Sequence, residues 1–278
     1  MIEEQAFLRG LPPIAGLSNT VYTTGRVPDR RIPTIAIIGT RRPTVYGTRV
    51  ACDFAEKLAR AGVVIVSGLA YGIDTAAHRG AVQSKGITIA VLAHGLDIVY
   101  PTGNQRLAGD ILEAGGALIS PYPPGTPVHR FRFLERNQWV AGLADAVLVV
   151  EAEERSGTKA TVRYALDLGK EVFAIPGPIT SSQSSGPNRL IAEGAHPALA
   201  PEDILRIIAP QLLKDAKHVP RGDTPEEQRV IQLIHSGITH TNDLSTTGNI
   251  PIDQLLPILT MLEIKGAIQN HNDGTWSL

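Results

Sequence analysis

Short apolar segments that end at glycine-containing turns, each followed by a helix-patterned segment, recur along most of the sequence. The clearest is residues 34–38, which ends at Gly39 and precedes a helical pattern from about Tyr46 to Ala61. Continuous apolar runs are typical of strands buried on both faces, and their alternation with helices indicates a mainly parallel, doubly wound α/β sheet. Further strands are expected at 63–66, 87–92, 116–120, 146–151 and 171–175, and further helices from about 73 and at 105–114, 131–143 and 158–168.

The turn after the first of these strands reads Gly39-Thr40-Arg41-Arg42. Glycine lets the backbone approach a ligand closely, the next helix directs its unpaired N–H groups into the same space, and the two arginines add positive charge. The turn is therefore predicted to bind an anion, most simply a phosphate. The alternative is a tight turn whose arginines are only solvated.

Glycine-rich or polar turns also follow the other predicted strands. In open parallel sheets, ligands bind beyond the carboxyl ends of the strands, near the point where the strand order reverses. Because purely structural turns have less reason to gather at one edge, a crevice is expected there. The dinucleotide fingerprint G-x-G-x-x-G and the P-loop are both absent, which disfavours an NAD or FAD enzyme. The turns concerned are at 39–41, 67–68, 94–95, 151–158 and 176–177.

The charge is distributed unevenly along the chain. Of 26 basic and 27 acidic residues, two basic and seven acidic ones lie from Asp223 onward, so this part has a balance of −5 and residues 1–222 a balance of +4. A polyanion should therefore bind the first part.

The single Cys52 argues against a disulfide framework, and no His, Asp or Glu spacing suggests a metal site or a cofactor. With neither an apolar signal core nor a membrane-spanning run, a cytoplasmic protein is expected.

A series of motifs follows in order over roughly residues 33–205: Gly39-x-Arg41 with Tyr46-Gly47, Ser67-Gly68-Leu69-Ala70-x-Gly72-Ile73-Asp74-x-x-x-His78, Gly95-Leu96-Asp97-x-x-Tyr100-Pro101-x-x-Asn104, Arg136-Asn137, Glu151-Ala152-x-x-x-Ser156-Gly157, Pro176-Gly177, and Asn188-x-Leu190-Ile191-x-x-Gly194-Ala195. Together they resemble the DNA-processing protein A family, DprA, also called Smf. Chance agreement over so many motifs is very small.

The resemblance implies an extended Rossmann-like domain that binds single-stranded DNA and forms a homodimer. It implies a mediator that protects incoming single strands and loads the RecA recombinase onto them in natural transformation, with no catalytic turnover and no cofactor. The expected organisation is an N-terminal arm at 1–32, a Rossmann-like DNA-binding domain at 33–209, a linker at 210–223 and a winged-helix domain at 224–278.

The sequence departs from the family pattern at one place. Members usually carry Arg-Asn-Arg after Phe-Pro, whereas here Phe133-Leu134 precedes Arg136-Asn137-Gln138. One basic residue of the expected groove is missing, and Arg130 or Arg132 is the expected replacement. The interleaved phenylalanines suit a single-strand groove, although such residues on an amphipathic helix usually face the core.

Arg41 is the first expected phosphate ligand, within a pocket that one nucleotide could occupy. The other candidates are arginines near the same edge, together with residues of the glycine-containing turns. The full set of predicted DNA- or phosphate-binding residues is Gly39, Arg41, Arg42, Gly47, Ser67, Gly68, Gly72, Asn104, Arg106, Arg130, Arg132, Arg136, Asn137, Ser156, Gly157 and Thr158.

A second set is expected to shape the pocket. Asp74, in a first helical turn, suits the helix dipole and orients amides. His78 is a candidate hydrogen-bond partner for Asp74, or a structural histidine. Tyr100 offers either a ring for base stacking or a buried packing element with Pro101. The predicted pocket-shaping residues are Asp74, His78, Gly95, Tyr100, Glu151 and Gly177.

Glu151 and the turn Ser156-Gly157-Thr158 allow one enzyme interpretation. A carboxylate beside such a turn is similar to the nucleoside-monophosphate hydrolases of the lysine-decarboxylase-like (LOG) group, where a glutamate stabilises an oxocarbenium-like ribose. Their Pro-Gly-Gly-x-Gly-Thr segment is not present. A capping role for Glu151 is the competing interpretation, and no enzyme activity is predicted.

The last part of the chain has the pattern of a winged helix: helices at about 225–235, 242–246 and 252–265, then a hairpin at 268–278 with Asp273-Gly274 at its turn. The third helix ordinarily enters the major groove of DNA, but here it has almost no positive charge. Because phosphate neutralisation supplies most non-specific affinity, this domain is expected to contact protein or to be structural.

Overall fold

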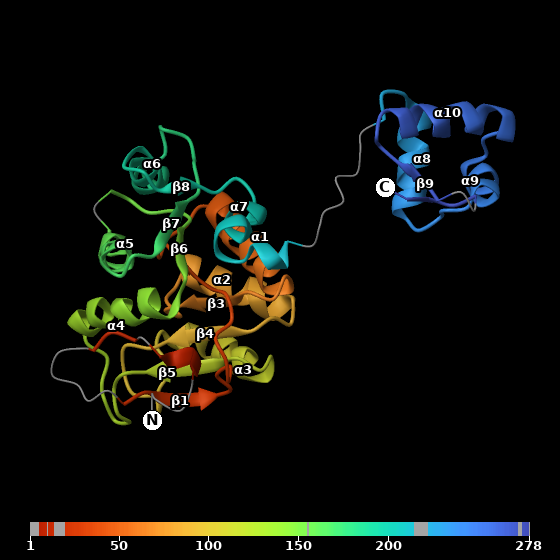
Figure 1. Cartoon of the computed structure of the whole chain (residues 1–278). Coiled ribbons are helices and arrows are strands. Elements are labelled where there is room, and N and C mark those ends of the chain that lie inside the picture. The colour runs from red at the N-terminus through yellow and green to blue at the C-terminus, as the bar shows by residue number, and fades with distance from the viewer. Residues whose placement is uncertain are drawn as a thin grey trace. The chain divides into compact units, whose positions relative to one another are not determined.

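The structure is a computed structural model that describes residues 6–9, 11–13, 20–154, 156–213, 222–271 and 274–277. The chain divides into two compact units, Met1–Leu213 and Lys214–Leu278 (Figure 1). Most of the predicted linker lies outside the described residues, as does Asp273 of the predicted hairpin turn. Among the described helices, none is both long and apolar enough to cross a membrane.

The large unit contains an eight-stranded sheet in the order β1-β5-β4-β3-β2-β6-β7-β8. All neighbouring strands are parallel except β1, which pairs antiparallel with β5 at one edge. The predicted mainly parallel α/β sheet is therefore confirmed. The strands are β1 (Tyr22–Gly25), β2 (Thr34–Ile38), β3 (Val64–Ser67), β4 (Thr88–Val91), β5 (Ala117–Ser120), β6 (Ala146–Val149), β7 (Glu171–Ala174) and β8 (His196–Pro197).

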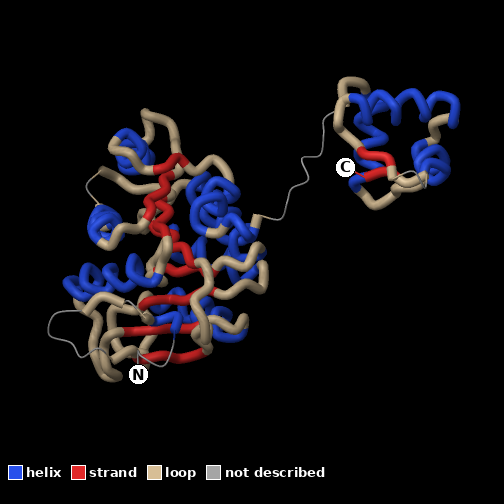
Figure 2. The backbone as a smooth tube through the Cα atoms, in the orientation of Figure 1, coloured by secondary structure: helices blue, strands red, loops and turns tan. Residues whose placement is uncertain are grey.

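Helices cover both faces of this sheet, which Figure 2 shows as one twisted layer between them. The helices are α1 (Val45–Arg60), α2 (Ile73–Gln83), α3 (Gln105–Glu113), α4 (Arg130–Leu143), α5 (Thr158–Asp167), α6 (Ser185–Ala192) and α7 (Pro201–Ile208). Along β2, Ile35 and Ile37 pack with α1, α2 and α7, whereas Ala36 and Ile38 pack with α4 and α5. Burial on both faces explains why the strand is apolar from Ile35 to Ile38.

Four short elements are missing from the sequence-based prediction. β1 lies within the predicted N-terminal arm and extends the sheet through β5. β8 has only two residues, and α6 and α7 have eight each. Elements this short carry too few residues to show a period of two or 3.6, so their pairing depends on the sheet that precedes them.

The strand order reverses next to β2. The chain places β3, β4 and β5 successively on one side of β2, and then returns to place β6 on the other side. Ile38 at the end of β2 is level with Val149 at the end of β6. The turn that begins at Gly39 and the segment that contains Glu151 therefore meet at the switch point, where ligands bind in sheets of this type.

The small unit contains α8 (Pro225–His235), α9 (Thr241–Gly248), α10 (Ile252–Ile264) and a hairpin of β9 (Gln269–Asn270) and β10 (Trp276–Ser277). This is the predicted winged-helix arrangement. Its core includes Val230, Leu244, Leu259 and Trp276. Because such a core is small, polar contacts between the elements also help to hold the unit together.

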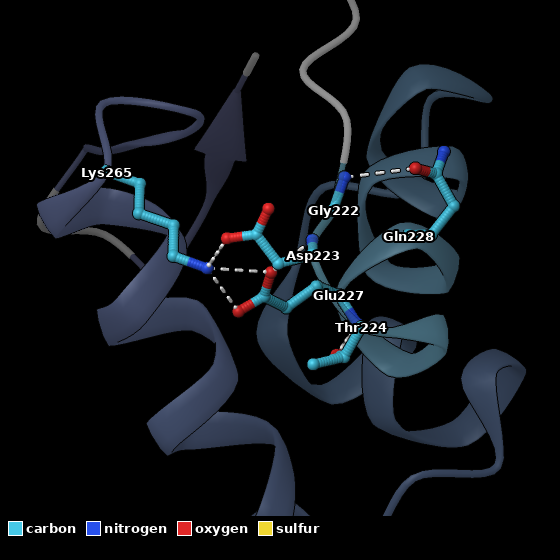
Figure 3. Close-up of polar contacts among 6 residues, drawn as sticks. All are labelled: Gly222, Asp223, Thr224, Glu227, Gln228 and Lys265. Atoms are coloured by element: carbon cyan, nitrogen blue, oxygen red, sulfur yellow. Dashed lines mark hydrogen bonds and ion pairs between the residues drawn. The ribbon is translucent and has the colours of Figure 1, made fainter.

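One polar cluster joins the start of α8 to the end of α10 (Figure 3). Lys265 Nζ lies 2.7 Å from Asp223 Oδ2 and 2.8 Å from Glu227 Oε1. The Lys265 ammonium lowers the pKa of both carboxyl groups. The Thr224 hydroxyl accepts a hydrogen bond from the Glu227 amide and so caps α8. Lys265, one of the two basic residues from Asp223 onward, is therefore engaged in contacts within the unit.

Candidate functional site

A pocket of about 330 Å³ lies at the switch point of the large sheet. Its walls come from the turns after β2 and β3, from one side of α4, and from the first turn of α5. The segments are distant in sequence and meet because the parallel strands end at one edge. Residues that line the pocket include Gly39, Thr40, Arg41, Gly68, Ala70, Asp74, Phe133, Arg136, Asn137, Ser156, Gly157, Thr158 and Thr161.

Arg41 lies on one wall of this pocket with its guanidinium carbon 5.2 Å from the centre of the Phe133 ring. A guanidinium that stacks on an aromatic face is held in place while its in-plane N–H donors remain directed outward. The neighbouring Arg42 is exposed and is not among the lining residues. The structure therefore distinguishes two arginines that are equivalent in the sequence pattern.

The first turn of α5 forms the opposite wall. Gly157 is the N-cap of this helix and makes no side-chain capping bond, and Ser156 and Thr158 beside it also line the pocket. The first N–H groups of a helix lack intrahelical partners and, with the helix dipole, favour an anion. Arg41 and the start of α5 together make a pocket that suits a phosphate.

The loop between β3 and α2 is strained and is fixed by two buried polar side chains. Leu69 has a positive φ of 58°, an unusual conformation for a leucine. The Asn104 amide donates to the Leu69 carbonyl at 2.9 Å, and Asp74 Oδ2 accepts from the amides of Gly68 (3.1 Å) and Ala70 (3.3 Å). Asn104 is only 2% exposed, so its role in this structure is to hold the loop. The geometry does not offer it as a direct DNA ligand.

Arg136 lies beneath the same loop and is 4% exposed. Its guanidinium donates to the carbonyl of Gly68 at 2.7 Å and to that of Val91. Burial lowers its pKa to about 10, an effect that the Asp74 carboxylate opposes, so the group is charged at neutral pH. Burial raises the pKa of Asp74, and the charge of Arg136 opposes that shift. Its Nε also donates to Asn137 Oδ1 at 3.3 Å, so Arg136 contributes charge to the floor of the pocket with three hydrogen bonds already made.

The close approach of Arg136 explains one of the glycines. A side chain at Gly68 would collide with this guanidinium. Gly72, at φ 85°, packs against the carbonyl of Thr40, where a side chain would also collide. The turns after β2 and β3 therefore touch through glycine, which is why both line one pocket.

His78 is fully buried and does not line the pocket. Its Nδ1 lies 2.7 Å from the Thr88 hydroxyl, which itself donates to the Ile65 carbonyl, so Nδ1–H is the donor. The bond to Asp74 that the sequence suggested is not formed. Burial and the charge of Arg136 lower the pKa of His78 to about 3. His78 is a neutral structural histidine.

Glu151 is 2% exposed and does not line the pocket. Its Oε2 accepts from the Thr44 amide at 2.8 Å, and its Oε1 accepts from the Thr44 hydroxyl at 2.6 Å. That hydroxyl in turn accepts from the Gly47 amide at 3.1 Å and caps α1. A side chain at Gly47 would collide with the Glu151 carboxylate. Glu151 therefore has the capping role, and Gly47 provides room for it.

The remaining candidates lie outside the pocket. Arg106 and Arg130 are exposed, and Arg132 stacks over the rings of Tyr122 (5.3 Å) and Phe131 (5.4 Å) while donating to the Pro127 carbonyl. Ser67 is buried and donates to the Ile37 carbonyl at 2.7 Å. The amide of Gly95 donates to the Thr126 carbonyl, and that of Gly177 to Asn188 Oδ1.

A second, smaller hollow of about 40 Å³ adjoins the first and shares Arg41, Gly68, Ala70 and Phe133 with it. Tyr71, Tyr100 and Pro101 complete its lining. Tyr100 is 45% exposed, so it is not a buried packing element. Of the two alternatives for the phenylalanines, the structure disagrees with a core position: Phe131 is 55% exposed and Phe133 lines both hollows. Sequence reasoning missed Tyr71, an aromatic residue inside a glycine-containing turn at the binding edge.

Among the described residues, no group of three or more His, Cys, Asp or Glu side chains is arranged to hold a metal ion.

A family model described as DNA recombination-mediator protein A matches residues 1–209. The chain belongs to the DNA recombination-mediator protein A family. A second model, described as the DprA winged helix domain, matches residues 214–274 and agrees with the small unit.

Several members of the DNA recombination-mediator protein A family are similar to the chain. A putative DNA processing protein DprA of Mycobacterium tuberculosis is 39% identical over 257 residues, which cover 87% of this chain and 64% of that protein. Protein Smf of Escherichia coli is 40% identical over 245 residues, covering 84% and 65%. The chain thus spans slightly less than two thirds of the length of these relatives.

Two solved structures of family members share the fold. DNA processing protein A of Helicobacter pylori, in a study of its single-stranded DNA binding mode, is 32% identical with a TM-score of 0.62, covering 71% of this chain and 88% of that one. DprA of Streptococcus pneumoniae is 40% identical with a TM-score of 0.59, covering 63% and 62%. These likenesses agree with the Rossmann-like sheet described above.

Proposed function

We propose that this protein binds single-stranded DNA in the groove formed by the two hollows at the switch point. In this proposal it protects incoming single strands and loads the RecA recombinase onto them during natural transformation or recombination, as a cytoplasmic homodimer without catalytic turnover. One observation carries the DNA-binding part: Arg41, held over Phe133, faces the uncapped start of α5 across a pocket of nucleotide size.

The chemistry of the groove favours single strands over duplexes. A phosphate pocket beside exposed aromatic rings suits a chain whose bases are unstacked and can lie on those rings. In a duplex the bases are already stacked on one another and their faces are inaccessible. Support also comes from the single-stranded DNA binding mode reported for the H. pylori relative.

RecA loading and homodimer formation rest on family membership. They call for tests of their own with the purified full chain: sedimentation velocity for the dimer, and capture of purified RecA by the immobilised protein. A monomer at micromolar concentration, or no retention of RecA above that by a bare support, would remove the corresponding part of the proposal.

The test of the DNA site compares Arg41→Ala with Arg42→Ala as a matched control. Fluorescence anisotropy with labelled single- and double-stranded oligonucleotides is measured over a salt series. Arg41→Ala should weaken single-strand binding about tenfold and reduce the salt slope by about one, because one phosphate contact is lost. Arg42→Ala, whose side chain does not line the pocket, should change both much less. If Arg41→Ala binds as tightly as the parent, the site is elsewhere.

The alternative, a nucleoside-monophosphate hydrolase, finds no support at Glu151. Both of its carboxylate oxygens are engaged by Thr44, and it does not line the pocket. For the winged-helix unit, we propose a protein-contact or structural role, because residues 223–278 carry a charge balance of −5 and α10 contains no basic residue. Tight duplex binding by isolated residues 223–278 would contradict this role.

A further inference from the structure

The smaller hollow of the groove gathers aromatic rings in a protein that has few of them. Only 5% of the residues are aromatic, yet Tyr71, Tyr100 and Phe133 line this one hollow. Tyr71 is 49% exposed and Tyr100 is 45% exposed, and both lie on short loops at the binding edge. Single exposed rings need no explanation, but three around one charged hollow indicate a ligand with flat apolar faces.

We propose that Tyr71 and Tyr100 form a second base-binding site beside the main pocket. The groove then holds two successive nucleotides of a single strand, with a phosphate next to Arg41. This inference rests on the proposed function and extends it by assigning base-stacking roles to two tyrosines. It also makes Tyr71 a determinant of how many nucleotides the groove contacts.

The position of Arg41 supports this arrangement. Arg41 and Phe133 belong to the lining of both hollows, so the cation lies where they join. In a strand, consecutive bases are separated by one phosphate, and the residue between two base sites should be its ligand. The ring of Tyr100 lies 6.1 Å from that of Phe133 at an interplanar angle of 50°, so the two rings are tilted relative to each other and are not stacked face to face.

The Tyr71 side chain is held in place by neighbouring residues. Its ring lies against the backbone of Gly103, where an added Cβ would be only 2.8 Å from the tyrosine Oη and 3.2 Å from Cε1. The loop that carries it is fixed by Asn104, which bonds the carbonyls of Leu69 (2.9 Å) and Ala70 (3.4 Å). A ring that is already in position loses little conformational entropy when a base stacks on it.

The experiment compares Tyr71→Leu with Tyr46→Leu in the full chain. Tyr46 is also 49% exposed but lines neither hollow, and its hydroxyl bonds the Pro176 carbonyl at 3.3 Å. Binding of a short labelled oligothymidylate is measured by anisotropy. Tyr71→Leu should weaken it about tenfold, as the loss of one stacked base requires. Tyr71→Trp should restore the affinity, and its fluorescence should be quenched by the oligonucleotide. Tyr46→Leu should bind as the parent does.

An abasic unit moved along the oligonucleotide adds a second readout. The parent should lose affinity at two neighbouring positions, and Tyr71→Leu at only one. If Tyr71→Leu binds within about twofold of the parent while Arg41→Ala is weakened, the second base site is wrong and the phosphate site stands. Equal losses in Tyr71→Leu and Tyr46→Leu, or no quenching of Tyr71→Trp, would also overturn it. Failure of the unmodified protein to bind the oligonucleotide would overturn both proposals.

Discussion

Replacing Glu151 by glutamine exchanges one oxygen of a buried side chain for an NH₂ group and removes its charge. In the native protein both carboxylate oxygens accept hydrogen bonds from Thr44, at 2.8 Å from its amide and 2.6 Å from its hydroxyl. Glutamine keeps a single acceptor, so one of these bonds is lost and the other is no longer charge-assisted. The N-cap of α1 and the turn that carries Arg41 are weakened as a result.

The expected cost follows from these two bonds. A hydrogen bond to a charged group contributes about 1.5–3 kcal/mol and one between neutral groups about 0.5–1.5 kcal/mol. Removal of the cost of burying the charge offsets part of the loss, which leaves a decrease of about 2 kcal/mol in the free energy of unfolding. For a unit of this size the melting temperature should fall by about 4–8 °C.

Differential scanning calorimetry of the full chain measures this shift, with Glu154→Gln as the control because Glu154 is exposed and only three residues away. The control should melt within about 1 °C of the parent. A melting temperature of Glu151→Gln equal to that of the parent would refute the capping role. If, in addition, the parent hydrolysed a nucleoside monophosphate and Glu151→Gln did not, the carboxylate would be catalytic.

Two further predictions concern buried polar groups. The pKa of His78 is lowered to about 3, so between about pH 6.5 and 3 the unfolded chain binds a proton that the folded chain does not. The free energy of unfolding should therefore fall as the pH drops through this range, by up to about 1.4 kcal/mol per unit, and urea titrations should show a shallower dependence for His78→Gln. Asn104→Ala leaves the Leu69 carbonyl without its amide donor and should destabilise the protein by about 1–3 kcal/mol. It should also weaken single-strand binding, as measured by anisotropy, because the loop with Tyr71 relaxes; unchanged affinity would contradict that link.

The sequence predicted much of the fold because the relevant signals are local. A short, mostly apolar strand, the glycine that ends it and the helix that follows lie within about 30 residues of one another, as in the segment from Thr34 to Gly62. The helix predicted at 46–61 is Val45–Arg60 in the structure. The edge strand β1 escaped prediction because its four residues are mostly exposed and pair only through the distant β5.

The sequence predicted at which edge of the sheet the site lies. It did not predict which contacts each side chain of the site makes. The pattern placed Arg41, Arg136, Glu151 and Asn104 near one another without distinguishing their roles. Their contacts join residues far apart in the chain: Glu151 bonds Thr44 across 107 positions and Arg136 bonds Gly68 across 68. Because of such long-range contacts, Arg136 is buried in the floor of the pocket, whereas Arg41 stacks on the Phe133 ring.

The sequence by itself determined the α/β class, the winged helix, the family resemblance and the edge at which a polyanion should bind. The fold class, the winged-helix pattern and the binding edge follow from periodicity, glycine placement and charge, and the resemblance follows from sequence motifs; all of these are properties of short stretches. Only the tertiary structure decided that Glu151 caps α1, that Asn104 holds a loop, and that Tyr71 and Tyr100 are exposed beside Arg41. Whether a polar or aromatic side chain meets a ligand depends on which other side chains satisfy or cover it, and those neighbours come from other strands and helices.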